Sequence, residues 1–411
     1  MSEAPTHTAE APRKVAYLLP SLAGGGVARG ILNLVAESVR RGMEVDLLLC
    51  RKAGAFQDEV PEGARLVVLR PSWPWRARSA AARATRSSWR ELLRPILLPL
   101  RGARAVRCLP DLVSYLEREQ PELLIATKPH TNLTALWARA LAQSQTRLVV
   151  GEQTNLTLET AGPKGRKWRW RYVAGLLKAE YAAADLIYSC SRGGADDLAQ
   201  KTGVPRKKIE VIYNAVVTDA LRRRPEPVSH PWFADGQPPV LLGVGRLDPQ
   251  KDFPTLIRAF ARVRAVRPAR LMILGEGRER RRLQEQAESL GVAEDFALPG
   301  FVANPSAYMA AAGVFVFSST YEGLGNALIE AMHAGCPVVS TDCPSGPAEI
   351  LEAGRYGPLV PVADDDALAE AIVGRLEAPR DSETLRKRAE QFDVATTLDR
   401  ILAGAYAPTR G

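Results

Sequence analysis

Two glutamates, Glu322 and Glu330, lie eight residues apart in the C-terminal half of the chain. Glu322 follows a short apolar run, Val314–Phe317, that is long enough for one buried parallel strand. A helical pattern then continues through Glu330 until Gly335 and Pro337 end the helix. A carboxylate beside a helix N-terminus can hardly bind phosphate, but it accepts hydrogen bonds from sugar hydroxyls. The pair therefore predicts a site that can hold two sugars.

The segments around the two glutamates place them at the edge of a sheet. The helix begins near Gly325, and a second buried strand, Val338–Thr341, follows it. In open α/β sheets, ligands bind outside the carboxyl ends of the strands. Unpaired N–H groups at a helix N-terminus favour an anion such as phosphate. We therefore expect the glutamates to lie in a ligand-binding mouth of an α/β domain.

A cationic turn precedes this segment in the same half of the chain. An apolar strand pattern that begins at Val240 runs into a turn with Gly243 and Gly245, followed by Arg246 and Lys251. Glycines let the backbone approach a ligand closely. The two cations can meet phosphate oxygens through charge-assisted hydrogen bonds. The turn therefore predicts phosphate binding.

Together these segments resemble the signature of the retaining glycosyltransferases of family 4. The likeness rests on EG at Glu322, EAM at Glu330, GCPVV at Gly335 and a GxGRL…K pattern that ends at Lys251. That family has the GT-B architecture, in which two Rossmann-like domains, each with a doubly wound parallel sheet, face each other across a cleft. The resemblance implies an α/β fold of this kind, with a nucleotide sugar held mainly by the C-terminal domain.

The resemblance also implies roles for individual residues. Glu322 would lie beside the donor sugar and Glu330 would bind the ribose, while Arg246 and Lys251 would clamp the diphosphate. The further donor-binding residues that it implies, with the base contacts last, are Gly25, Gly26, Gly243, Gly245, Gly323, Leu324, Gly325, Asn326, Phe301 and Val302.

The N-terminal half also opens with a strand, a glycine turn and a helix. The strand Lys14–Leu19 leads into glycines at 24–26, which do not form the GxGxxG fingerprint of dinucleotide binding. We interpret this turn as close backbone approach to a substrate. His130 and Glu152 each follow a predicted strand at the carboxyl edge of the same sheet. Both a structural and a catalytic role stay open for His130, which the resemblance would let touch the donor sugar or the acceptor.

The segment 70–107 is strongly basic. It carries ten arginines and one acid, Glu91, and ten minus one equals the net charge of +9 of the whole chain. Tryptophans and leucines interleave with the arginines, and 164–171 has a similar mixture, which suits an anionic bilayer surface. A solvated basic face is the alternative, and nucleic acid is not expected because no binding motif accompanies the charge. The candidate acceptor or membrane residues are Arg76, Arg78, Arg83, Arg86, Arg90, Lys167 and Arg169.

Length and composition limit the classes of protein to which this chain can belong. At 411 residues, with 46% hydrophobic and 25% charged residues, the chain has material for two globular domains. No apolar run reaches the roughly 20 residues that span a bilayer. Five cysteines form no CxxC pair, so a zinc or disulfide framework is not expected and a reducing cytoplasm fits. The run at 364–366 is expected to cap a helix, so no metal site is predicted.

Strand and helix patterns alternate along the chain, which indicates doubly wound parallel sheets. We expect a disordered tail at 1–12, an acceptor-binding domain at 13–214, a linker at 215–239, a nucleotide-sugar domain at 240–392, and a C-terminal helix at 393–411 that can cross back to the first domain. The predicted strands not yet named are 45–49, 66–69, 123–126, 148–151, 186–190, 210–212 and 270–274.

The expected activity is retaining, metal-independent transfer of a hexose or N-acetylhexosamine from a nucleoside-diphosphate sugar, with UDP favoured, to a glycan or lipid-linked acceptor. No cofactor is expected. The Ser345-Gly346-Pro347 variant is similar to one in transferases that build bacterial surface glycans and lipid-linked oligosaccharides. Together with the two basic segments, it leads us to expect a peripheral place on the inner face of the cytoplasmic membrane. Two alternatives stay open. One is a sugar-nucleotide epimerase of the same fold, and the other is a non-catalytic adaptor for membranes or polyanions.

Overall fold

The chain forms two compact units. The first holds the residues up to Cys190, those at 195–212 and those from Ala395 onward, while the second holds 191–194 and 213–394. The computed structural model describes residues 12–23, 25–54, 56–98, 103–161, 167–223 and 225–407, without the side chains of Trp168 and Arg169, so all but Pro12 of the tail predicted at 1–12 lies outside the described residues.

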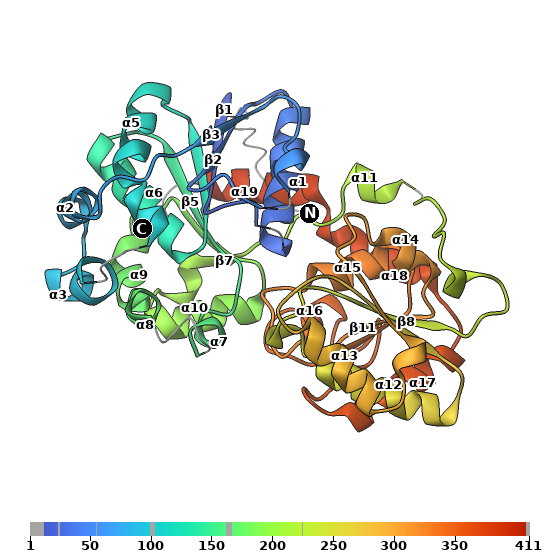
Figure 1. Cartoon of the computed structure of the whole chain (residues 1–411). Helices are drawn as coiled ribbons and strands as arrows, with labels where there is room; N and C mark the ends of the chain where they lie inside the picture. Colours follow the sequence, from blue (N-terminus) through green and yellow to red (C-terminus); the bar gives the residue numbers. More distant parts are fainter. Residues whose placement is uncertain are drawn as a thin grey trace, which may run out of the picture. The chain divides into compact units, whose positions relative to one another are not determined.

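The first unit is built on a parallel sheet of seven strands in the described residues, in the order β3-β2-β1-β4-β5-β6-β7 (Figure 1). The predicted strands are confirmed, and the largest shift is at β3, which begins at Ala64 rather than Leu66. The connections from β1 and β4 lead in opposite directions, so the loops after these strands flank a topological switch point. The strands are β1 Lys14–Leu19, β2 Glu44–Leu49, β3 Ala64–Val68, β4 Leu123–Thr127, β5 Arg147–Glu152, β6 Leu186–Ser189 and β7 Ile209–Val211.

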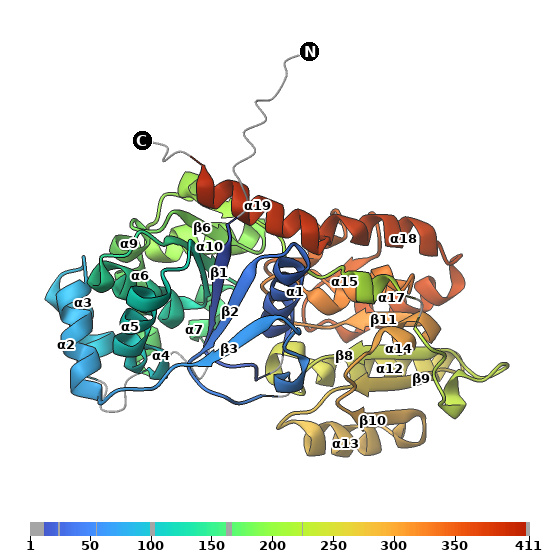
Figure 2. The same ribbon diagram turned by 90° about the horizontal axis from the view of Figure 1, so that it is seen from above.

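Helices cover both faces of this sheet. One face carries α5, α6, α9 and α10, whose apolar residues form one core with the strands, and the other carries α1 and α19. Helices α2 and α3 lie outside α5 and α6 (Figures 1 and 2). The bounds are α1 Gly26–Arg40, α2 Pro74–Ala84, α3 Trp89–Leu92, the π-helix η2 Leu93–Leu97, α4 Arg104–Arg107, α5 Leu109–Glu119, α6 Pro129–Ala142, α7 Leu156–Ala161, α8 Trp168–Arg171, α9 Val173–Tyr181, α10 Arg192–Thr202 and α19 Val394–Tyr406.

The second unit has a parallel sheet of six strands in the described residues, in the order β10-β9-β8-β11-β12-β13. Its switch point lies between β8 and β11. The sequence patterns missed β10, whose register shifts between Ala297 and Gly300, and β13, which is only two residues long. The strands are β8 Val240–Val244, β9 Arg270–Leu274, β10 Phe296–Gly300, β11 Val314–Phe317, β12 Val338–Thr341 and β13 Leu359–Val360.

Helices α12, α13 and α17 share one core with this sheet, and α14, α15 and α18 pack together on its other face. None of the helices in the described residues of the chain combines the length and the apolar character that crossing a membrane requires. The bounds are α11 Asp219–Arg222, α12 Phe253–Val266, α13 Arg280–Ser289, α14 Ser306–Ala311, α15 Asn326–His333, α16 Pro347–Ile350, α17 Asp365–Glu377 and α18 Ser382–Ala389.

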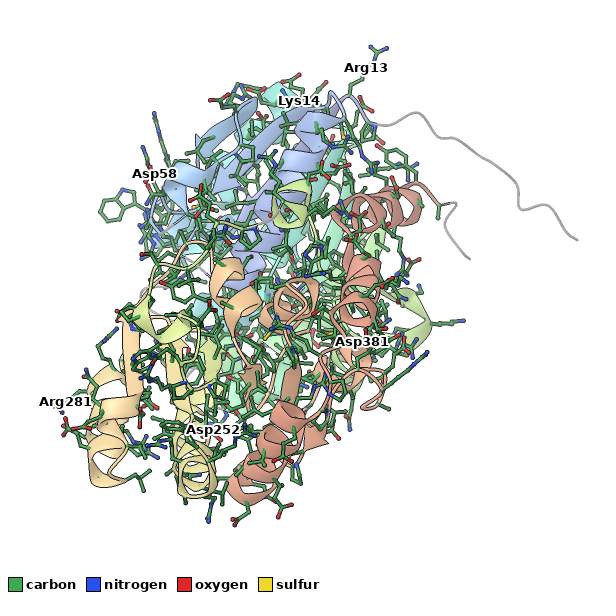
Figure 3. All side chains as sticks on the ribbon, turned by 90° about the vertical axis from the view of Figure 1, so that its right-hand side faces the viewer. Arg13, Lys14, Asp58, Asp252, Arg281 and Asp381 are labelled. Carbon is green, nitrogen blue, oxygen red and sulfur yellow. The ribbon has the colours of Figure 1, made fainter. Side chains whose placement is uncertain are left out.

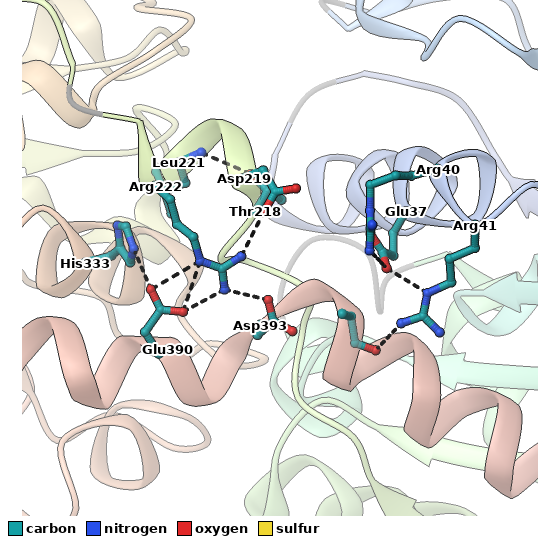
Figure 4. A network of polar contacts seen from close by, with 11 residues as sticks. Glu37, Arg40, Arg41, Thr218, Asp219, Leu221, Arg222, His333, Glu390 and Asp393 are labelled. Atoms are coloured by element: carbon teal, nitrogen blue, oxygen red, sulfur yellow. Dashed lines mark hydrogen bonds and ion pairs between the residues drawn. The ribbon is translucent and has the colours of Figure 1, made fainter.

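The segment 215–239, which was predicted to be a linker, packs within the second unit. The N–H groups of Val216 and Val217 donate to the carbonyl of Phe392 at 3.1 and 3.0 Å. Arg222 then donates to Glu390 and to Asp393, each at 2.7 Å (Figure 4). These bonds attach the chain at 216–222 to the segment before α19.

Helix α19 belongs to the first unit from Ala395 onward. Arg41, at the end of α1, forms an ion pair with Asp399 and donates to the carbonyl of Ala395 at 3.1 Å. Arg147 donates to the carbonyl of Ala405 at 3.0 Å. The C-terminal helix is thus held along its length by arginines of the first unit.

Candidate functional site

The loops after β8 and β11 meet at the switch point of the second sheet. Lys251 ends the short helical turn Pro249–Lys251 after β8, and Glu322 lies in the loop after β11. The Lys251 Nζ lies 2.6 Å from the Oε1 of Glu322, and the two side chains are 16% and 10% exposed. Because β8 and β11 are neighbours in the sheet, two residues 71 positions apart form a nearly buried ion pair.

Other side chains fix the orientation of this pair. Ser319 donates to the Oε1 of Glu322 at 2.7 Å, and the Nε2 of Gln250 lies 3.5 Å from its Oε2. The Lys251 Nζ lies 5.0 Å from the centroid of the Phe317 ring, a cation–π distance. The carboxylate is thus held by donors from both loops.

Glycines give Lys251 its space. A Cβ at Gly245 would lie 3.0 Å from the Cε of Lys251. Gly275, with φ of +148°, passes so close to the carbonyl of Gly245 that a Cβ would lie 1.9 Å from that oxygen. Gly243 faces the core instead, because its Cβ would meet Phe253 at 3.1 Å. Of the two glycines predicted in this turn, Gly245 is the one that borders the site.

Arg246 lies in the same loop as Lys251 but at the surface. Its side chain is 63% exposed and pairs with Asp248 at 3.1 Å. The structure therefore does not bring Arg246 to Glu322. An exposed guanidinium on this loop can meet a ligand that covers the carboxyl edge of the sheet.

The turn before α15 depends on close backbone packing. Gly325 has φ of +113° and precedes the helix, and Gly323 and Leu324 are buried beside it. Gly346, with φ of +102°, passes the carbonyl of Leu324 so closely that a Cβ would lie 1.8 Å from the oxygen. The predicted turn residues thus fix where α15 begins.

Helix α15 presents an N-terminus suited to an anion. No side chain caps it and no acid lies in its first turn. The Oδ1 of Asn326, its first residue, accepts a hydrogen bond from Asn214 at 2.8 Å. Glu330 lies in the second turn and is half-buried.

Phe301 and Val302 directly follow β10 at the same carboxyl edge of the second sheet. The Phe301 side chain is 53% exposed, whereas Val302 is half-buried. The carbonyl of Gly300 accepts from the N–H of Gly275 at 2.7 Å, which ties this segment to the loop after β9. An exposed aromatic ring here suits a contact with a nucleotide base.

The first unit has its own switch-point residues. Gly25, with φ of +95°, and Gly26 follow β1 and open α1. His130 follows β4 as the second residue of α6, is 7% exposed, and lies with its ring centroid 4.6 Å from that of Trp170 at 73°. The predicted placement of these residues at the carboxyl edge is confirmed.

Glu152, the last residue of β5, belongs to a buried polar network. Its Oε1 accepts from Asn132 at 3.0 Å and from the hydroxyl of Tyr181. Burial raises the pKa of Glu152 to about 8, which the hydrogen bond from Tyr181 opposes. Since all three residues are at most 2% exposed, the network is internal and does not line a substrate site.

The predicted basic residues lie in two segments, one at α2 and α3 and the other at the start of α8. Arg78 is half-buried, and the side chain of Arg169 lies outside the described residues. The exposed ones are Arg76, Arg83, Arg86, Arg90 and Lys167.

The sequence interpretation missed Ser319 and Gln250, which orient Glu322. Their only local signal is position: Gln250 precedes Lys251, and Ser319 lies three residues before Glu322. Across the described residues there is no group of three or more His, Cys, Asp or Glu side chains that could hold a metal ion.

The carboxyl edge of the second sheet combines three kinds of group. Lys251 and Arg246 can bind phosphate oxygens, as can the N-terminus of α15. Glu322 can accept hydrogen bonds from hydroxyls. Such an edge suits a ligand that joins a diphosphate to a sugar.

Comparisons with known proteins agree with this chemistry. Residues 238–378 match the family model described as Glycosyl transferases group 1, and residues 24–220 match Glycosyltransferase Family 4. The N-acetylgalactosamine-N,N'-diacetylbacillosaminyl-diphospho-undecaprenol 4-alpha-N-acetylgalactosaminyltransferase of Campylobacter jejuni is 33% identical over 281 residues, which are 66% of this chain and 72% of that protein.

Two further proteins are similar. The lipopolysaccharide core biosynthesis glycosyltransferase LpsE of Rhizobium meliloti is 39% identical over 134 residues, 33% of this chain and 38% of that protein. The crystal structure of Anabaena HepE with UDP and glucose has a TM-score of 0.72 at 20% identity and covers 95% of this chain and 98% of that one. With its two parallel-sheet units, the chain belongs to glycosyltransferase family 4 and has the GT-B fold.

Proposed function

We propose that this glycosyltransferase moves a hexose or N-acetylhexosamine from a nucleoside-diphosphate sugar, with UDP favoured, to a hydroxyl of a glycan or lipid-linked acceptor. The contact between Lys251 and Glu322 at the second switch point carries the proposal. It puts a cation that can bind phosphate and a carboxylate that can bind hydroxyls on one sheet edge.

The similar proteins support the substrate classes. Anabaena HepE was crystallised with UDP and glucose. The Campylobacter jejuni relative is named for transfer of N-acetylgalactosamine to a diphospho-undecaprenol-linked sugar. A UDP-sugar donor and a lipid-linked acceptor therefore fit this chain best, and its proposed place is the inner face of the cytoplasmic membrane.

The proposed reaction retains the anomeric configuration. The bond between the anomeric carbon and the diphosphate oxygen breaks, and the acceptor oxygen bonds on the same face. The acceptor proton passes to the leaving phosphate oxygen. Lys251 and Arg246, with the first N–H groups of α15, stabilise the charge on that phosphate without a metal or another cofactor. Glu322 orients the donor sugar, and Glu330 binds the ribose.

The carboxyl edge of the first unit would then bind the acceptor. Gly25 leaves room for a ligand to approach the backbone closely, since nothing lies within 4 Å of a Cβ built there. His130 lies at the same edge, with part of its ring surface against Trp170. We assign His130 to contact with the acceptor or the donor sugar.

A panel of UDP-, GDP- and ADP-sugars tests the donor. A bound donor stabilises the folded protein and so raises its melting temperature. At a donor concentration of one hundred times Kd, this stabilisation is about 2.7 kcal/mol. Lys251→Ala should abolish this shift and slow donor hydrolysis by orders of magnitude. Lys387→Ala, at an exposed lysine on α18 that pairs with Glu383, is the matched control and should behave as wild type.

The product decides between the activities. Transfer with retention appears as an unchanged anomeric coupling in the NMR spectrum of the product, and full activity in EDTA supports the metal-independent scheme. Conversion of the donor sugar without an acceptor would identify an epimerase. No stabilisation and no hydrolysis with any sugar nucleotide would leave the non-catalytic adaptor as the better assignment.

A further inference from the structure

Two basic segments that are far apart in the sequence form one surface on the first unit. Helix α8 packs against η2, and α3 packs against α9. The Arg94 guanidinium lies 4.9 Å from the centroid of the Tyr172 ring, and Arg171 lies 5.8 Å from the same ring. Both views place α2 and α3 together on the flank of this unit (Figures 1 and 2). We call this face, formed by α2, α3, η2 and α8, the Trp–Arg surface.

Large aromatic side chains project from the Trp–Arg surface. Trp73, Trp75 and Trp89 are 72%, 64% and 64% exposed. Arg76 lies 5.5 Å from the ring centroid of Trp75, and Arg90 lies 5.7 Å from that of Trp89. Three exposed tryptophans on neighbouring helices are unusual for an ordinary protein surface and indicate an interaction site.

The charge of the surface is nearly all positive. Its single acid among residues 70–98 is Glu91, which closes the capping box of α3 with Ser88. In the part of the chain that the structure describes, none of the exposed guanidinium groups of this segment forms an ion pair with a carboxylate. They belong to Arg70, Arg76, Arg83, Arg86, Arg90 and Arg94.

The Trp–Arg surface is held firmly from below. Ala77 and Ala81 of α2 and Ile96 of η2 are buried in the core of the first unit. The buried carboxylate of Glu180 accepts from the N–H of Arg86 at 2.9 Å and from the Thr85 hydroxyl at 2.5 Å. The tryptophans therefore lie on or beside helices whose inner faces pack into the core of the first unit.

The surface also reaches the edge that carries His130. Trp170 of α8 lies with its ring against the His130 ring, 4.6 Å between centroids. Trp73 follows β3 in the sequence, and the carboxyl end of β3 lies at the same edge of the sheet. A partner bound to the Trp–Arg surface thus lies beside the proposed acceptor edge.

We propose that the Trp–Arg surface docks on an anionic lipid bilayer. Tryptophan rings and guanidinium groups both prefer the headgroup region, and an anionic bilayer offers apolar and anionic partners together. A nucleic-acid duplex would pair its phosphates with the arginines but would offer little contact to the three exposed rings. The proposal concerns membrane binding alone, so it can hold or fail independently of the transferase chemistry.

Sedimentation of the full chain with vesicles tests the proposal. Vesicles of equal parts phosphatidylglycerol and phosphatidylcholine should bind the protein, and pure phosphatidylcholine should not. The variant R76A/R83A/R90A should bind the anionic vesicles about 100-fold more weakly, from about 5-fold for each arginine. The variant W73A/W75A/W89A should bind at least about tenfold more weakly, at unchanged charge.

A matched control removes three exposed arginines of the second unit. Arg281, which points away from α13 (Figure 3), Arg282 and Arg355 are 90%, 67% and 72% exposed. The control R281A/R282A/R355A should bind the vesicles as wild type does. Each variant should keep the wild-type melting temperature, because none of the replaced side chains is buried.

Several results would overturn the proposal. Equal binding to neutral and anionic vesicles would contradict recognition of anionic lipid, and full binding by the tryptophan variant would contradict insertion of the rings. The proposal also fails if wild type ignores vesicles but binds a DNA duplex in a way that the arginine variant loses, which would identify a polyanion site. Quenching of tryptophan fluorescence by brominated acyl chains in wild type, and its loss in the tryptophan variant, supports insertion at headgroup depth.

Discussion

Lys251 and Glu322 lie 2.6 Å apart, although the sequence interpretation assigned them to different parts of the ligand. Lys251 was expected at the diphosphate and Glu322 at the sugar. In the free protein each neutralises the other, with Ser319 as a third partner. A bound donor must therefore contact two side chains that already form an ion pair with each other, rather than two separate groups.

We predict that the pair is energetically coupled. Lys251→Met and Glu322→Gln should each lower the free energy of unfolding by about 2 kcal/mol, because each leaves its nearly buried partner without its counter-charge. The double variant should lose at least about 1 kcal/mol less than the sum of the single losses. Urea unfolding of the four proteins measures this coupling, and additive losses would show that the contact contributes nothing.

Gly245→Ala should impair the site while sparing the fold. The new Cβ would meet the flexible end of Lys251 at 3.0 Å, so the lysine moves rather than the backbone. If Lys251 binds the donor phosphate as proposed, its displacement should lower turnover by about 10- to 100-fold. Steady-state kinetics and thermal unfolding test this together.

Gly374→Ala is the control for that substitution. Gly374 lies inside α17, and no atom lies within 4 Å of its added Cβ. Alanine should raise stability by about 0.5–1 kcal/mol and leave turnover unchanged. An equal loss of turnover in both variants would show that Gly245→Ala does not act through the position of Lys251.

Glu152→Gln should change how stability depends on pH. Burial raises the pKa of Glu152 from 4.5 to about 8, so the native state keeps a proton that the unfolded chain releases. The stability that this proton contributes is present below about pH 4.5 and is lost as the pH rises toward 8. Glutamine keeps the acceptor for Asn132 and cannot ionise. Its stability relative to wild type should therefore rise by about 1.4 kcal/mol per pH unit across this window.

Urea unfolding at several pH values between about 5 and 8 measures the Glu152 effect. Glu288→Gln, at an exposed position of α13, should follow the wild-type profile. A constant difference between Glu152→Gln and wild type at all pH values would mean that Glu152 ionises normally in the folded protein.

Arg222→Met should loosen the segment before α19. Arg222 bonds Glu390 and Asp393 (Figure 4), and its hydrogen bond lowers the pKa of Glu390. The loss should be about 1 kcal/mol near pH 7, because the groups are partly exposed. Because its pKa is lowered in the folded protein, Glu390 contributes stability above its unfolded-state pKa. This contribution is lost as the pH falls through its folded-state pKa. The difference between variant and wild type should therefore shrink below about pH 4, and a difference that grows there would contradict the assignment.

Much of the fold could be predicted because parallel strands carry a local signal. Strands such as β1 and β11 are buried on both faces, so each appears as a short apolar run between turns. β10 and β13 escaped because one has an irregular register and includes Pro299, and the other is two residues long. Gly325 could be placed before α15 for an equally local reason, since its φ of +113° suits glycine.

The sequence by itself determined at which sheet edge the candidate residues lie, because a residue directly after a parallel strand must lie at the carboxyl edge. Only the tertiary structure decided which of them meet. The order of strands makes β8 and β11 neighbours and so pairs Lys251 with Glu322, while Arg246 in the same loop stays at the surface. The packing of α8 on η2 likewise joins two basic segments into one face, a contact between distant residues that no local pattern encodes.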